Sequence, residues 1–130
     1  MKKMLITVIL TFISTSISTS AMAEWTLIQS SDDADMYIDF DSMEASGGLL
    51  KAWTLTDYKS LQENQVLSAT WRELYDCNIE KFKVLSISKF SESMGAGKSI
   101  ELTNFNDAHW SAVVPYSIGE LKSKIICSKK

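Results

Sequence analysis

Residues 68–77 read SATWRELYDC, and this stretch carries the clearest structural pattern in the chain. Its apolar residues recur at every second position and so share one side: Ala69, Trp71, Tyr75 and Cys77. Glu73 is the only residue on that side that breaks the pattern. Alternation with a period of two predicts a strand with one face against a core and the other in water.

Similar segments on both sides of this strand predict a sheet. They are rich in aromatic and β-branched residues and are separated by polar or glycine-containing turns, such as Gly47-Gly48. The expected strands cover residues 25–28, 36–39, 50–58, 82–90, 98–104 and 110–114. In the stretch 82–90 the apolar positions change parity between Val84 and Leu85, which indicates either a bulge or two covered faces.

The hydrophobic period changes near the C-terminus. Ser117 and Glu120 stand at the two ends of a capping box, and Tyr116 and Leu121 stand at the hydrophobic-staple positions. An apolar stripe with helical spacing follows: Ile118, Leu121 and Ile125. The pattern predicts a short helix over residues 118–126. The expected fold class is α+β, with a single antiparallel β-sheet and a C-terminal helix packed on one face.

The N-terminus has the layout of a secretory signal peptide. Lys2-Lys3 precede an apolar run over residues 4–13, a Ser/Thr-rich stretch and the small-x-small site Ala21-Met22-Ala23. We therefore expect cleavage between Ala23 and Glu24. An uncleaved anchor is the alternative, although about ten apolar residues are too few to span a bilayer.

Removal of residues 1–23 would leave a single domain over residues 24–130, a length that suits one domain. This part has 11 basic and 16 acidic residues, a net charge of −5. An acidic chain with Arg72 as its one arginine is a poor nucleic-acid binder. It has no second apolar run of spanning length, and no cysteine at its start to carry a lipid anchor. The expected location is the periplasm, the cell surface or the medium.

The two cysteines, Cys77 and Cys127, both lie in the part expected to be exported. Two cysteines in such a chain most simply form one disulfide bond, which would tether the predicted helix to the strand over residues 68–77. Free thiols or a metal site are the alternatives. A metal site normally needs about four N or S ligands, whereas this chain has one histidine and no CxxC motif, so we expect no metal.

Gly95-Ala96-Gly97-Lys98-Ser99 is similar to a phosphate-binding loop. That motif needs a further glycine five residues before Gly97, where this chain has Glu92. The charge of Glu92 would repel a phosphate. We interpret the segment as a turn between strands and expect no nucleotide cofactor.

A run of acidic residues matches part of a calcium-binding loop. Its members are Asp33, Asp35, Asp39, Asp41 and Glu44. The sixth position of such a loop needs glycine for a sharp turn, but here it is Ile38, inside a predicted strand. We interpret these residues as acidic strand ends and a polar turn.

His109 is the only histidine. Acid–base catalysis by a lone histidine needs a nucleophile or an orienting carboxylate. Asp107 is close in the sequence but falls in a predicted loop, and a disulfide bond would remove the cysteine nucleophile. Haem ligation is a weaker alternative. We expect a surface or half-buried histidine, no catalytic residue, no cofactor and no enzymatic activity.

Short motifs also recur across nearly the whole predicted mature chain. They comprise Trp25, Ile28, Ser30–Asp33, Tyr37–Asp39, Gly47-Gly48, Lys51, Trp53, Asp57–Lys59, Tyr75–Cys77, Leu85-Ser86, Ser91, Met94-Gly95, Gly97, Trp110, Val113, Pro115 and Cys127. Together and in this order, they resemble the surface-adhesin protein E family of small exported bacterial proteins. The resemblance implies a curved antiparallel sheet with the helix held on its concave side by the disulfide bond. It also implies a non-catalytic role, because the family's namesake is an envelope protein that binds host proteins and can dimerise.

The expected function is therefore that of a non-catalytic exported envelope protein, a protein-binding module of the adhesion type. Its expected partners are host or envelope proteins, or a second copy in a homodimer. The alternative is a soluble periplasmic protein with a housekeeping role that binds a small ligand in the sheet–helix cleft. Because a sheet of this size leaves an edge strand, we expect contacts through that edge or an exposed aromatic residue, and not through His109.

Overall fold

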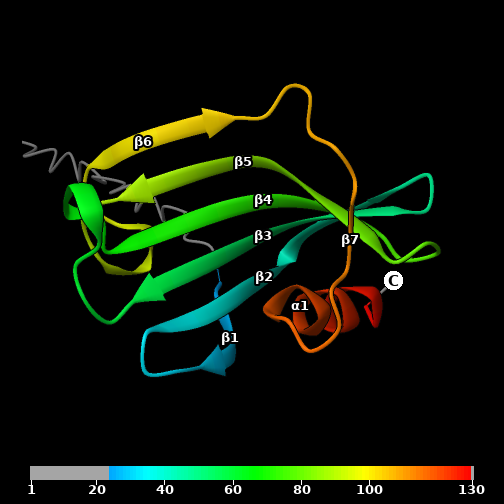
Figure 1. Ribbon diagram of the computed structural model, residues 1–130, viewed down its shortest axis with the longest axis horizontal. Coiled ribbons are helices and arrows are strands. Elements are labelled where there is room, and N and C mark those ends of the chain that lie inside the picture. Colours follow the sequence, from blue (N-terminus) through cyan, green and yellow to red (C-terminus); the bar gives the residue numbers. More distant parts are fainter. Residues whose placement is uncertain (1–23, 130) are drawn as a thin grey trace, which may run out of the picture.

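The computed structural model describes residues 24–129, which form a curled antiparallel sheet and one C-terminal helix (Figure 1). The signal peptide predicted over residues 1–23, with its cleavage between Ala23 and Glu24, lies outside the described residues. The strands are β1 (Thr26–Ser30), β2 (Ala34–Ser46), β3 (Leu49–Tyr58), β4 (Ser68–Asp76), β5 (Lys81–Phe90), β6 (Ser99–Asn104) and β7 (Ser111–Ala112). The remaining elements are the 3-10 turns η1 (Glu63–Gln65) and η2 (Ser93–Gly95) and the helix α1 (Ile118–Cys127).

The sheet is a meander in which the strands from β1 to β6 lie side by side in chain order. β7 pairs with the beginning of β5, where Ala112 lies opposite Lys81, whereas β6 pairs with the end of β5. In the described part of the chain, β1 therefore forms one edge of the sheet, and β6 and the short β7 form the other. No helix within residues 24–129 is long and apolar enough to cross a membrane.

The hairpin between β2 and β3 turns at Gly47-Gly48, as predicted. Both residues have a positive φ, 58° and 82°, which tight hairpin turns need and which glycine adopts without strain. The prediction that the preceding strand ends at Asp39 is wrong, because β2 continues to Ser46. Its pairing with β3 shifts between Asp39 and Glu44, so the alternation of apolar residues is lost there although the strand continues.

β5 contains a bulge where its apolar residues change parity, which confirms the first of the two interpretations. Arg72 pairs with Ser86 and Glu73 pairs with Val84, so Leu85 has no partner on β4. An extra residue of this kind bends its strand and increases the local twist. The bulge therefore contributes to the curl of the sheet.

The helix α1 begins at the predicted cap. The Ser117 hydroxyl accepts a hydrogen bond from the Glu120 N–H at 3.1 Å. The Glu120 carboxylate accepts from the N–H of Tyr116 at 3.2 Å, one residue earlier than in an ideal capping box. The backbone of Tyr116 is in the left-handed region, with φ 61°, and the residue is 101% exposed. The predicted staple between Tyr116 and Leu121 is therefore wrong.

The main core lies where α1 meets the sheet. Its buried members come from β2, β3, β4 and α1: Ile38, Leu50, Ala52, Tyr75 and Ile126. On the helix, Lys122 and Ile126 are the buried residues, whereas Ile118 is 38% exposed. The side of α1 that is buried therefore differs from the predicted apolar stripe, and it includes a lysine.

Candidate functional site

A buried polar cluster lies between α1 and the sheet. At its centre is the Glu73 carboxylate of β4, with only 1% of the residue exposed. Lys122 of α1 donates to both carboxylate oxygens, at 2.8 and 3.1 Å. The Thr54 hydroxyl of β3 donates to one oxygen at 2.5 Å, and the Tyr75 hydroxyl donates to the other at 3.0 Å. Glu73, which interrupts the apolar alternation of its strand, is thus the partner of Lys122, which is buried on the inner side of α1.

Protein donors surround the Glu73 carboxylate. Two carboxylate oxygens offer about four acceptor positions, and all four are occupied by protein donors. The Lys122 ammonium also lies 5.9 Å from the centre of the Trp71 ring. Burial, and then the neighbouring Glu73 charge, raise the pKa of Tyr75 far above its ordinary value, so this phenol is a neutral donor. Through these bonds the Glu73 carboxylate joins α1 to the strands β3 and β4.

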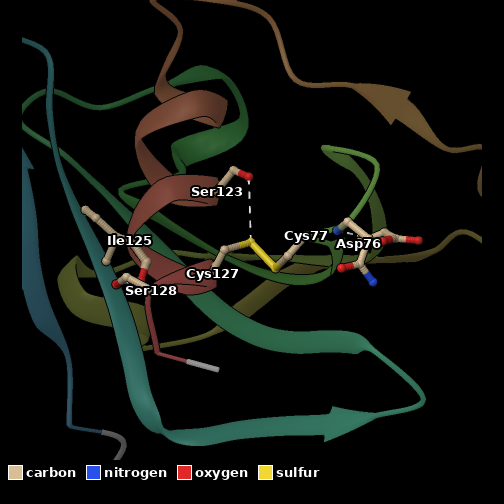
Figure 2. The surroundings of a disulfide bond; sticks show 7 residues. Asp76, Cys77, Ser123, Ile125, Cys127 and Ser128 are labelled. Carbon is tan, nitrogen blue, oxygen red and sulfur yellow. Dashed lines mark hydrogen bonds between the residues drawn. A yellow bond between two sulfur atoms is a disulfide. The ribbon is translucent and has the colours of Figure 1, made fainter.

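A disulfide bond between Cys77 and Cys127 provides a second tether for α1 (Figure 2). It joins the residue after β4 to the last residue of the helix, with a Cα–Cα distance of 5.7 Å. The Ser123 hydroxyl lies one helical turn before Cys127 and 4.0 Å from its sulfur. The bond closes a separation of 50 residues, and in the chain-entropy model a cross-link restricts the unfolded chain more as the closed loop lengthens.

The edge strand β6 presents unpaired backbone groups. The Phe105 N–H donates to the Leu85 carbonyl at 2.9 Å, and this pair continues the register in which Ser88 faces Leu102. Opposite residues in an antiparallel ladder alternate between bonded and non-bonded pairs. Leu102 and Asn104 consequently turn their N–H and C=O groups away from β5, toward the open side of the sheet.

The same edge carries exposed apolar side chains. Leu102 is 60% exposed and Phe105, directly after the strand, is 40% exposed. β6 contains neither proline nor lysine, two residues that often protect edges from pairing, although Ile100 forms a bulge in it. At the opposite edge, β1 exposes Leu27 (53%). Sequence patterns predicted that an edge exists, and the pairing register identifies which groups are free on β6.

The other sequence-predicted candidates lie apart from these features. His109 and Asp107 are both exposed, in the segment between β6 and β7. Glu92 fills the turn of the phosphate-loop-like segment, since a Cβ on Gly97 would lie 2.7 Å from its side chain. Ile38, at the calcium-loop position, is fully buried in β2. Within residues 24–129 no group of His, Cys, Asp or Glu is arranged to hold a metal ion.

The four tryptophans are all half-buried. Besides Trp71, two of them lie beneath cations: the Arg72 guanidinium is 5.8 Å from the centre of the Trp53 ring, and the Lys83 ammonium is 4.8 Å from that of Trp110. The fully exposed aromatic residue is instead Tyr116, which the sequence pattern assigned to the staple. Sequence analysis thus identified aromatic residues as candidates without identifying the exposed one.

These features define a class of small proteins with a curled antiparallel meander, one terminal helix and a disulfide bond that joins them. Comparison with known families gives the same class, since the model of the surface-adhesin protein E family matches residues 25–128. The chain belongs to this family. A search of curated proteins gives no match.

Solved structures of protein E from Haemophilus influenzae share this fold. One has a TM-score of 0.59 and 13% sequence identity, and the alignment covers 85% of this chain and 88% of that one. Protein E from a non-typeable strain aligns with a TM-score of 0.58 and 13% identity, over 85% of this chain and 79% of that chain. A second crystal form of the H. influenzae protein has a TM-score of 0.56 and 13% sequence identity. Its alignment covers 78% of this chain and 91% of that one.

Proposed function

We propose that this protein is a non-catalytic, exported envelope protein that works by contact with another macromolecule through the edge strand β6. In this proposal residues 1–23 are a cleaved signal peptide and residues 24–130 form a single adhesion-type domain at the cell surface or in the periplasm. The contacts are made with host or envelope proteins, or with a second copy of the chain. Membership of the surface-adhesin protein E family supports this reading.

The observation that carries the proposal is the open side of β6. An extended segment of a partner can add to such an edge, gaining main-chain hydrogen bonds from the outward groups of Leu102 and Asn104. The exposed Leu102 and Phe105 side chains would supply apolar contact on either side of the added strand. In the same proposal α1 packs on one face of the sheet, where Lys122 keeps its charge away from solvent by pairing with Glu73.

Two proline variants in β6 test this mode of binding. Leu102→Pro removes an outward N–H, so we expect loss of binding with little change in fold. Thr103→Pro is the matched control, because its N–H points toward β5 and its replacement removes a hydrogen bond inside the sheet. Binding is measured to wells coated with extracellular-matrix proteins, and thermal unfolding reports the fold of each variant. His109→Ala should bind like the original protein. Unchanged binding by a folded Leu102→Pro variant would refute the role of β6.

Surface labelling of intact cells tests the location. A membrane-impermeant amine reagent should modify an adhesion-type protein, since several lysines, such as Lys124, are well exposed. A periplasmic protein would be labelled only after the outer membrane is opened.

The alternative function is a periplasmic protein of housekeeping role that binds a small ligand between sheet and helix. An open hollow of about 390 Å³ lies there, between Gln29 of β1 and the first turns of α1 at Ile118 and Leu121. Protection from the surface reagent, together with a ligand that shifts the NMR signals of these residues, would favour this alternative.

A further inference from the structure

A second hollow lies at the end of the sheet remote from α1, beside the turn η1 (Figure 1). It has a volume of about 320 Å³, near the lower limit for small-molecule sites. Its lining comes from the end of β3, the loop that contains η1, and β5. The lining residues are Tyr58, Gln62, Glu63, Asn64, Val66 and Lys89.

The lining is polar, with one aromatic ring. Gln62 and Asn64 each offer a carboxamide that both donates and accepts, Glu63 accepts, and Lys89 donates. Tyr58 offers a ring and a hydroxyl, and Val66, 4% exposed, is the buried aliphatic member. An apolar ligand would cover these polar groups without satisfying them, which costs free energy.

The charges of the hollow disfavour an anionic ligand. The lining contains one carboxylate, that of Glu63, and one ammonium, that of Lys89, so its six residues carry no net charge. Lys89 is also paired with Glu101 of β6 at 3.3 Å, and its positive charge is therefore already partly matched. An anionic ligand would meet two carboxylates near one ammonium.

The loop on the rim is held in a strained conformation. Asn64 and Gln65 are consecutive non-glycine residues with positive φ, 58° and 66°. Asparagine tolerates this region, whereas glutamine is not among the residues that visit it routinely. The loop is nevertheless fixed, because the Gln62 N–H donates to the Val66 carbonyl at 2.9 Å and its side chain donates to the Ser60 carbonyl at 2.9 Å. Backbone strain that is retained in a fixed loop is concentrated at functional sites.

We propose that this hollow binds one sugar unit of a neutral glycan. The Tyr58 ring lies against the C–H face of the sugar, while the carboxamides of Gln62 and Asn64 and the Glu63 carboxylate bond its hydroxyls. Lys89, whose charge is already partly matched by Glu101, donates to a further hydroxyl. A polyhydroxylated ring is the ligand class that satisfies a neutral lining with both donors and acceptors and with one aromatic surface. Lys89 is paired with Glu101 of β6, but the lining includes no residue of that strand, and the proposal does not depend on the function proposed for β6.

The test is an NMR titration of the purified protein with three neutral disaccharides: maltose, cellobiose and N,N′-diacetylchitobiose. At least one should give saturable shifts confined to the amides of residues 58–66 and Lys89. Glucose 6-phosphate should give smaller shifts in that region than glucose does.

Two glycine substitutions provide matched variants. Asn64→Gly keeps the left-handed backbone but removes a carboxamide from the lining, and should weaken binding about fivefold, the effect of one net hydrogen bond. Gln65→Gly relieves the same kind of strain next to it, at a residue outside the lining, and should bind like the original. The proposal is overturned if none of the disaccharides gives saturable shifts there, if both variants bind equally, or if the phosphate ester binds more tightly than glucose.

Discussion

Substitution of Lys122 by methionine should destabilise the protein far more than a change at a surface lysine. Methionine keeps most of the side-chain length but removes the ammonium that donates to both Glu73 oxygens. Glu73, 1% exposed, then keeps only the bonds from Thr54 and Tyr75 and has no countercharge. Breaking a buried ion pair by removing one partner costs about 3–5 kcal/mol.

That loss is large for a domain of this size, whose total free energy of unfolding is expected to be about 5–15 kcal/mol. Urea unfolding followed by tryptophan fluorescence measures it, because Trp71 lies next to the cluster. Lys124→Met is the control: this side chain is 73% exposed and pairs with Glu120 on the surface, so the change should have little effect on the free energy of unfolding.

A double variant separates the loss of the pair from the loss of packing. Glu73→Gln in the Lys122→Met background removes the isolated charge, while the amide still offers an acceptor to Thr54 or Tyr75. We expect the double variant to recover at least about 2 kcal/mol relative to Lys122→Met. The reasoning is refuted if Lys122→Met loses no more than Lys124→Met, or if the second substitution recovers nothing.

Three other predictions concern the disulfide bond, the alkaline limit and the N-terminus. Cys127→Ser should lower the free energy of unfolding by about 2–5 kcal/mol, and the native protein should be two hydrogens lighter than its reduced form by intact mass; reactive thiols in freshly purified native protein would contradict the bond. The pKa of Tyr75 is raised in the folded state from 10.0, so its contribution to stability is complete below about pH 10 and is lost as the pH rises above that value. Thermal unfolding between neutral and strongly alkaline pH should show this loss, and absorbance at alkaline pH should show one of the four tyrosines ionising only as the protein unfolds. N-terminal sequencing of the exported protein should begin at Glu24, and a sequence that starts at Met1 would disprove cleavage.

Local sequence signals predicted the elements that depend on neighbouring residues. The parity change between Val84 and Leu85 located the bulge of β5, and Gly47-Gly48 located a hairpin turn. Both signals work because the backbone geometry that they report is set within a few residues. The hydrophobic staple did not form, although it too involves neighbouring residues. The Tyr116 N–H donates to the Glu120 carboxylate, and Tyr116 itself is exposed to solvent.

The polar cluster could not be predicted, although both of its charged members stood out in the sequence. Glu73 broke the alternation of its strand, and Lys122 lay beside the apolar stripe of its helix. Each is unfavourable in a core by itself and becomes acceptable only opposite the other. They are 49 residues apart in the chain, a separation over which sequence periodicity carries no information. The hollow beside η1 could not be predicted for the same reason. Lys89 is distant in the chain from residues 62–66 and lies beside them only because of the pairing of the strands.

The position of α1 after all the strands of the sheet has a consequence for biogenesis under the proposed function. If the chain is exported as proposed, it crosses the membrane from its N-terminus, so the strands from β1 to β6 reach the far side before Lys122, Ile126 and Cys127 do. Until then the Glu73 carboxylate has no countercharge, and the apolar side of the sheet that includes Leu50 has no cover. The meander would then begin to pair during translocation, and we expect it to become resistant to proteases only when the last turns of the helix arrive. A nonsense mutation that removes α1 alone should consequently yield a degraded product, although every strand is still encoded.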